Sequence, residues 1–177
     1  MKVNYEDFRT IIILVDQQKN IVIFPMSKTD YPIELADGTM IEYSYLPAYY
    51  PIELSYPYTA TELADKIEYG INQWNVHKCY DNFSGKNTFE EKYYNIKGFK
   101  NAVKGHLYFR LGWDDIQKKY VTLMFPWKRG YSYDYADKKT LPDDADWIDY
   151  ANAVIDYINM DFMTLEHFRR CKSEYNI

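Results

Sequence analysis

One segment of this 177-residue chain is unusually rich in aspartate, and its carboxylates are the side chains best suited to a chemical role. Residues 134–161 hold eight Asp, no Glu and only two Lys, Lys138 and Lys139, so the segment has a net charge of −6. The rest of the chain holds 18 acidic and 19 basic residues, a balance of +1. Carboxylates at this density attract Lys and Arg side chains, and here they carry the whole net negative charge of the protein.

Most of these aspartates fall on a predicted helix at 143–159. Acidic residues open it, where the helix macrodipole favours them. Apolar residues at helical spacing predict a buried stripe made of Trp147, Ala151, Val154, Ile155 and Ile158. The helical projection places on the opposite, outward face Asp146, Asp149, Ala153 and Asp156, flanked by Tyr150 and Tyr157.

Three tyrosines precede this helix at alternate positions, so in an extended chain they would project from one face. Tyrosine combines ring area with a polar tip, and aromatic side chains are enriched at protein interfaces. We therefore expect these rings and the acidic helix to bind a protein partner. The predicted contact residues are Tyr131, Tyr133, Tyr135, Asp143, Asp144, Asp146, Asp149, Tyr150, Asp156 and Tyr157.

The spacing signatures of common enzymes are absent. The seven glycines form neither G-x-G-x-x-G nor a P-loop, and no G-x-S-x-G is present. His77 and Cys79 form H-x-C, but further ligands at zinc-site spacing are missing. The acidic pair Glu90-Glu91 is typical of a solvated face. We predict no catalytic residue, no cofactor and no metal, while an enzyme whose site is assembled by the fold stays an alternative.

The most regular pattern lies at 107–127, and it predicts a β-hairpin. Large apolar residues alternate with polar or small ones on both sides of a polar loop at 114–119. Because successive side chains of a strand point to opposite faces, the apolar set shares one face, which we expect to be the floor of the core. This set is Leu107, Phe109, Leu111, Trp113, Val121, Leu123, Phe125 and Trp127.

Further strands are predicted in the first third of the chain. β-Branched runs at 10–15 and 21–24 indicate a second hairpin that is covered on both faces. The pentapeptide Tyr-Pro-Ile-Glu-Leu occurs at 31–35 and 50–54 and predicts two short edge strands, since proline lacks the N–H that an inner strand needs. Residues 40–46 predict one strand between them.

Two helices are predicted in the middle of the chain. Thr59 and Glu62 have capping-box spacing, and the helix should continue to about Val76 with a stripe of Leu63, Ile67, Ile71 and Trp74. Residues 88–96 predict a shorter helix that ends at Gly98. The chain thus predicts one α+β domain, residues 1–177, with a mainly antiparallel sheet built from hairpins and three to four helices packed on it.

Composition narrows the classes of function. The net charge of −5 and pI near 5.2 argue against nucleic-acid binding, which relies on clustered Lys and Arg. No run approaches the ~18 apolar residues of a membrane span, and the first residues lack signal-peptide features. We therefore expect a cytoplasmic protein with no membrane contact. Cys79 and Cys171 are too few for a disulfide framework and should be reduced thiols.

An acidic, Tyr-rich α+β domain without a catalytic signature is similar to bacterial toxin-immunity proteins. The segment Leu46-Pro47-Ala48-Tyr49-Tyr50 also resembles the Leu-Pro-x-x-Tyr element of one immunity superfamily, although the Asn-Gly that follows in that superfamily is absent and its fold is not carried over. The resemblance implies stoichiometric neutralisation of a basic toxin, such as a nuclease. A ligand-binding or carbohydrate-binding module that uses exposed Tyr and Trp rings is the other alternative.

Overall fold

The computed structural model describes residues 9–30, 32–34, 38, 40–41, 45–79, 88–114, 118–127 and 130–160, with the backbone alone at 33–34, 41, 114, 125–127 and 130–136. Its strands are β1 Arg9–Val15, β2 Ile21–Lys28, β3 Ile33–Glu34, β4 Met40–Ile41, β5 Tyr45–Pro47, β6 Ile52–Leu54, β7 Leu107–Asp114, β8 Lys118–Trp127 and β9 Gly130–Leu141. Its helices are α1 Ala60–Asn72, α2 Phe89–Tyr94, α3 Phe99–Ala102 and α4 Trp147–Asn159.

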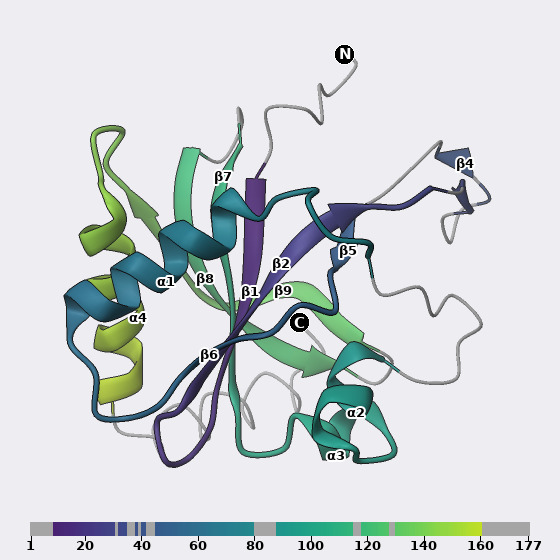
Figure 1. The fold of residues 1–177 in the computed structure, drawn as a ribbon, viewed down its shortest axis with the longest axis horizontal. Coiled ribbons are helices and arrows are strands. Elements are labelled where there is room, and N and C mark those ends of the chain that lie inside the picture. Colours follow the sequence, from purple (N-terminus) through teal and green to yellow (C-terminus); the bar gives the residue numbers. More distant parts are fainter. Residues whose placement is uncertain are drawn as a thin grey trace.

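A seven-stranded antiparallel sheet forms the centre of the molecule (Figure 1). Its strand order is β5-β2-β1-β7-β8-β9, and β6 also pairs with β2. The α+β class and the antiparallel, hairpin-built sheet are confirmed. The two predicted hairpins are joined by antiparallel pairing of β1 with β7, in which Ile13 lies opposite Phe109.

The central hairpin is confirmed as β7 and β8. Phe109 lies opposite Leu123 and Leu111 opposite Val121, and all four side chains are buried on one face, as their alternation predicts. Backbone pairing continues from Asp114 to Lys118, so the connecting loop is shorter than predicted. The reason is that ladder hydrogen bonds join main chains and do not require apolar side chains.

The N-terminal hairpin is covered on both faces, as predicted, because alternate residues of β1 and β2 belong to two core clusters on opposite faces of the sheet. Residues 50–54 supply the edge strand β6 on β2, whereas 31–35 contribute β3 to a separate pair with β4. The single strand predicted at 40–46 is instead two strands, β4 and β5. Short pieces of this kind form where a chain follows an edge and changes partner.

Helices α1 and α4 cover one face of the sheet and pack against each other (Figure 1). Leu63 and Ile67 from α1 join Ala151 and Val154 from α4 in one core cluster with the inward residues of the strands. Gly70 lets α1 approach closely, since a Cβ there would lie 3.0 Å from Ile23 Cγ2. These two helices form a layer whose outer surface is exposed.

The opposite face of the sheet is covered by a second cluster. Phe89 of α2 packs on Phe24 with ring centroids 4.8 Å apart. Trp74 belongs to this cluster and not to the stripe of α1, because α1 ends at Asn72 and the following turn carries the ring to Tyr45. The short α3 was not predicted. None of the helices in the described part of the chain is long and apolar enough to span a bilayer.

The pair Glu90-Glu91 does not form the solvated face that its charge suggested. Glu90, in the first turn of α2, is 1% exposed. Glu91 is the N3 residue of a capping box with Thr88. The prediction was wrong for Glu90 because the first turn of this short helix is turned towards the sheet.

Candidate functional site

The acidic helix starts later than predicted. α4 begins at Trp147, and Asp143 and Asp144 lie in a preceding turn closed by a 3.0 Å hydrogen bond from Ala145 N to Pro142 O. Asp146 is the N-cap: its Oδ1 accepts from the backbone N–H groups of Ile148 at 2.9 Å and Asp149 at 3.2 Å. Asp149 completes the capping box by accepting from Asp146 N at 2.9 Å. Asp143 and Asp144 thus belong to the turn, whereas Asp146 and Asp149 cap the start of the helix.

These contacts predict a difference between neighbouring aspartates. Asp146→Ala should lower the free energy of unfolding by about 1 kcal/mol, because it leaves helix N–H groups without their acceptor. Asp144→Ala is the control: its carboxylate makes no hydrogen bond or ion pair with any described residue, so the loss should stay within about 0.5 kcal/mol. Urea denaturation measures both, and equal losses would contradict the assignment of Asp146 as the cap.

Two further aspartates make ion pairs at the surface. Asp156 Oδ2 lies 3.1 Å from Lys139 Nζ, and Asp143 Oδ1 lies 3.4 Å from Lys118 Nζ. The Lys139 ammonium also lies 4.5 Å from the ring centroid of Tyr157. Exposed pairs contribute little to stability, so these carboxylates remain able to exchange partners.

Tyr150 and Tyr157 are not at the margin of the exposed face, and this part of the prediction was wrong. They are 1% and 0% exposed, and their hydroxyl groups donate to Gly112 O at 2.7 Å and to Asp137 Oδ2 at 2.9 Å. Burial raises the pKa of both phenols. Because each hydroxyl finds an acceptor at the sheet, the ring can enter the core, and neither side chain is available to anchor a partner.

The buried stripe of α4 is accordingly rotated from the predicted one. It consists of Tyr150, Ala151, Ala153, Val154 and Tyr157. Trp147, Ile155 and Ile158, which were predicted to belong to the stripe, are only partly buried. The exposed side of the helix therefore carries Asp149 and Asp156 with Asn152 and Asn159 between and beyond them.

The predicted tyrosines at 131, 133 and 135 lie on β9, and their side chains are outside the described part of the structure. In the backbone, Tyr135 is opposite Met124 and Tyr131 is opposite Pro126, with register shifts between these pairs. Tyr135 stands two residues from Asp137, which contacts α4 through Tyr157, and Tyr131 lies further along the strand. Partner contacts by Tyr131, Tyr133 and Tyr135 stay a prediction.

The acidic surface extends onto α1, which sequence reasoning missed. Glu62, Asp65 and Glu68 are exposed on the side of α1 that faces away from the sheet. Hydrogen bonds from Thr59 lower the pKa of Glu62, so its charge is held at the helix start. A helical projection opposite Leu63 and Ile67 would have found these residues; counting charge along a continuous segment could not.

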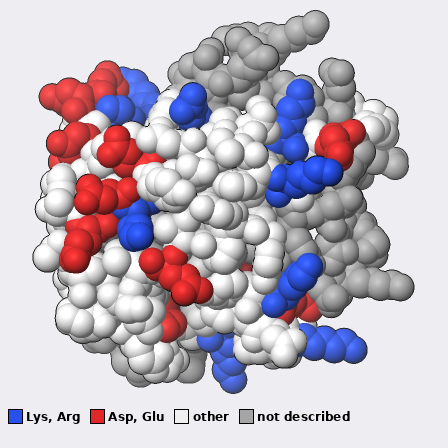
Figure 2. All heavy atoms as spheres, in the orientation of Figure 1, with Lys and Arg blue, Asp and Glu red and all other residues white. Residues whose placement is uncertain are grey.

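We call the combined surface of α1, α4 and the turn before α4 the acidic face. Figure 2 shows most acidic side chains gathered over the helical layer on the left of the view, with some basic side chains among them and further basic side chains on the right. Tyr69, 45% exposed and four residues after Asp65, supplies an aromatic ring beside it. The acidic face consists of Glu62, Asp65, Glu68, Asp143, Asp144, Asp146, Asp149 and Asp156.

We describe two of the cavities that are lined by described residues. One lies beside Trp113 and the start of α4, and the other includes Asp16, Glu53 and Tyr93. Neither has a histidine among its described lining residues, so neither pairs an imidazole with a carboxylate. The described residues also contain no cluster of three or more His, Cys, Asp or Glu arranged to hold a metal.

Comparisons with protein-family models, with curated proteins and with solved structures find no match to this chain.

Proposed function

We propose that this protein binds a basic protein partner through the acidic face and neutralises it stoichiometrically, as an immunity protein does with a basic toxin. The observation that supports the proposal is the collection of eight exposed carboxylates on two neighbouring helices and one turn. The partner class that fits best is a nuclease, since such enzymes hold nucleic acid with Lys and Arg. The proposed setting is the cytoplasm, where the half-buried thiol of Cys79 would stay reduced.

The distribution of charge supports binding more strongly than the net charge does. Residues 143–156 and α1 are distant in sequence, yet the fold places their carboxylates on one helical layer and the turn that precedes α4. Like charges at this density repel one another and oppose folding, while they raise the rate at which a basic surface arrives. In the complex, these carboxylates would pair with the cations that otherwise hold phosphate groups.

Affinity needs anchors as well as charge. The buried Tyr150 and Tyr157 cannot supply them, and Tyr69 takes that place in the proposal. Its hydroxyl lies 3.1 Å from that of Tyr50, whose ring stacks on His77 with centroids 3.8 Å apart, so the ring is held before a partner arrives. A rigid, partly exposed aromatic side chain is typical of interface hot spots.

The charge part of the proposal is tested with Asp65→Asn, Glu68→Gln and Asp144→Asn combined. No hydrogen bond or ion pair of these three side chains is found within the described residues, so the melting temperature should hardly change. The partner captured by the tagged chain should be basic, and its association rate constant should fall by about tenfold at low salt and depend less on ionic strength. Surface plasmon resonance at several salt concentrations measures this.

Asp30→Asn is the matched control for the single change Asp65→Asn. Both remove one exposed carboxylate, but Asp30 lies beyond the end of β2 and is not part of the acidic face. Tyr69→Ala should instead raise the dissociation rate constant. Equal effects of Asp30→Asn and Asp65→Asn would assign the result to net charge alone. A partner whose binding is unchanged by the triple variant and by Tyr69→Ala would refute the proposed surface.

A further inference from the structure

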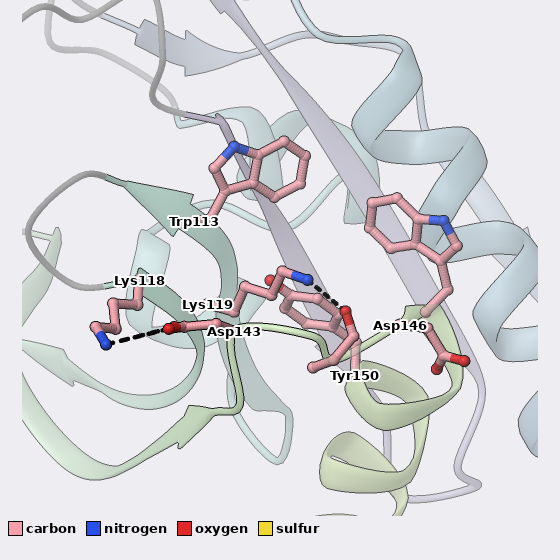
Figure 3. Close-up of a pocket in the computed structure, with 8 residues that line it drawn as sticks. Trp113, Lys118, Lys119, Asp143, Asp146 and Tyr150 are labelled. Atoms are coloured by element: carbon pink, nitrogen blue, oxygen red, sulfur yellow. Dashed lines mark hydrogen bonds and ion pairs between the residues drawn. The ribbon is translucent and has the colours of Figure 1, made fainter.

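A cavity of about 520 Å³ lies where the β7–β8 hairpin meets the start of α4 (Figure 3). Its volume is within the range of pockets that hold small organic molecules. Trp113 from β7 and Trp147 from α4 form apolar walls with ring centroids 6.1 Å apart, and Tyr150 lines it from the core side. The Tyr150 hydroxyl is already bound to Gly112 O, so its ring offers the cavity an apolar surface.

The charged side chains around this cavity differ in the interactions that they already make. Asp143 pairs with Lys118 at the outer edge, and Asp146 is occupied by the backbone N–H groups of α4. Lys119 lies directly opposite Trp113 on the hairpin and extends across the cavity below that ring (Figure 3). Its ammonium donates to a neutral acceptor, the carbonyl oxygen of Ala145.

Among the described residues no carboxylate lies within ion-pair distance of Lys119. The ammonium has three N–H donors, and one of them is used by Ala145, so donors remain for a bound group. Arg9 adds a second positive charge on the outer side of Trp113, with its guanidinium carbon 5.9 Å from the ring centroid. The cavity therefore combines apolar aromatic walls with a cation that has no anionic partner among the residues that the structure describes.

We propose that this cavity binds a small aromatic carboxylate, with the ring against Trp113 and Trp147 and the carboxylate on Lys119. A charge-assisted hydrogen bond to the ammonium would replace or join that of Ala145. The cavity borders the acidic face, because Asp143 and Asp146 belong to both, but the group that would hold the anion is the Lys119 ammonium. The same net charge of −5 opposes binding of any anion at long range, so a preference for an anion requires a local cation.

The test uses three probes that share one ring and differ in charge: indole-3-acetate, indole-3-acetamide and tryptamine. Each is titrated into the ¹⁵N-labelled full chain, and the indole N–H resonances of its tryptophans are followed by NMR, with assignments from single Trp→Phe variants. The resonances of Trp113 and Trp147 should shift, and that of Trp74, which lies in the other core cluster, should not. The acetate should bind about tenfold or more tightly than the amide, and the amine most weakly.

Lys119→Met removes the ammonium and keeps an apolar stem of similar length. It should abolish the preference for acetate over acetamide, while amide binding stays within about twofold. Lys119→Arg should retain the preference. Lys118→Met is the matched control, because it removes the neighbouring charge at the outer edge, and the order of the probes should persist. The proposal is overturned if no probe shifts Trp113 or Trp147, if the three bind equally or in reversed order, or if Lys119→Met keeps the acetate preference.

Discussion

Phe109→Ala is expected to lower the free energy of unfolding by about 3–5 kcal/mol, as large-to-small changes in a packed core do. Phe109 is 0% exposed and lies in the middle of β7. It contacts the sheet through its neighbours Ile13 and Leu123 and contacts α4 through Tyr157, with ring centroids 5.6 Å apart. Removing the ring would leave a cavity between the sheet and the helical layer. The cavity cannot close, because β1, β8 and α4 all pack around this position.

Leu123→Ala, on the facing strand, should cost about 2–5 kcal/mol for the same reason. Tyr49→Ala is the control. Like Phe109→Ala it deletes an aromatic ring, but at a position that is 43% exposed. Its loss should be about 1 kcal/mol or less. Urea denaturation followed by circular dichroism measures all three. Losses below ~1 kcal/mol for both core variants would mean that the inner face of the central hairpin does not hold the two layers together.

The strands of the two hairpins, β1–β2 and β7–β8, and the longer helices were predictable because each rests on a local pattern, whereas the length of β9 was not predicted. Alternation fixed the inner face of the hairpin around Phe109, and the capping box at Thr59 marked the start of α1. The pairing of β1 with β7 joins positions about a hundred residues apart, and no local pattern determines it. The start of α4 was misplaced because acidic residues favour both a turn and a first helical turn, and only the hydrogen bonds of Asp146 separate the two.

The sequence predicted which aspartates of the candidate site are exposed, but it did not predict that Tyr150 and Tyr157 are buried. Most carboxylates stay at the surface because burying their charge is costly; Glu90 is an exception, and the five predicted aspartates at 143–156 are all exposed. A tyrosine side chain can be buried or exposed, and which of the two occurs depends on whether its hydroxyl finds a hydrogen-bond acceptor in the core. Gly112 O and the Asp137 carboxylate provide those acceptors for Tyr150 and Tyr157, and both come from other elements of the fold.

Glu90 gives the second prediction with a large expected effect. It is 1% exposed, and its Oε2 is buried with no hydrogen-bond partner among the described residues. Burial raises the pKa of this carboxyl from its usual 4.5 to about 7, and the nearby Glu91 acts in the same direction, while hydrogen bonds from Thr88 and from its own backbone oppose them. The folded protein thus holds a proton on Glu90 at pH values where the unfolded chain has released it.

The sign of the pH dependence follows from proton binding. Between pH 4.5 and about 7 the folded state binds one more proton at Glu90 than the unfolded state, so this residue makes stability fall as the pH rises. The contribution is fully present below pH 4.5 and lost above about 7, and a shift of this size corresponds to roughly 3 kcal/mol. His106 acts in the opposite direction near neutral pH, because burial lowers its pKa, so a variant and the parent chain must be compared at each pH.

Glu90→Gln keeps the shape of the side chain and removes the charge, so the variant should gain stability relative to the parent chain as the pH rises. The difference in the free energy of unfolding should grow by about 3 kcal/mol between pH 4.5 and pH 8, whatever constant cost the amide adds. Urea denaturation at intervals of half a pH unit measures it. Glu68→Gln, the same chemical change at an exposed position of α1, should give a difference that stays within about 0.5 kcal/mol over the range. A constant difference for Glu90→Gln as well would show that Glu90 is ionised in the folded protein throughout, with solvent or a partner reaching its second oxygen.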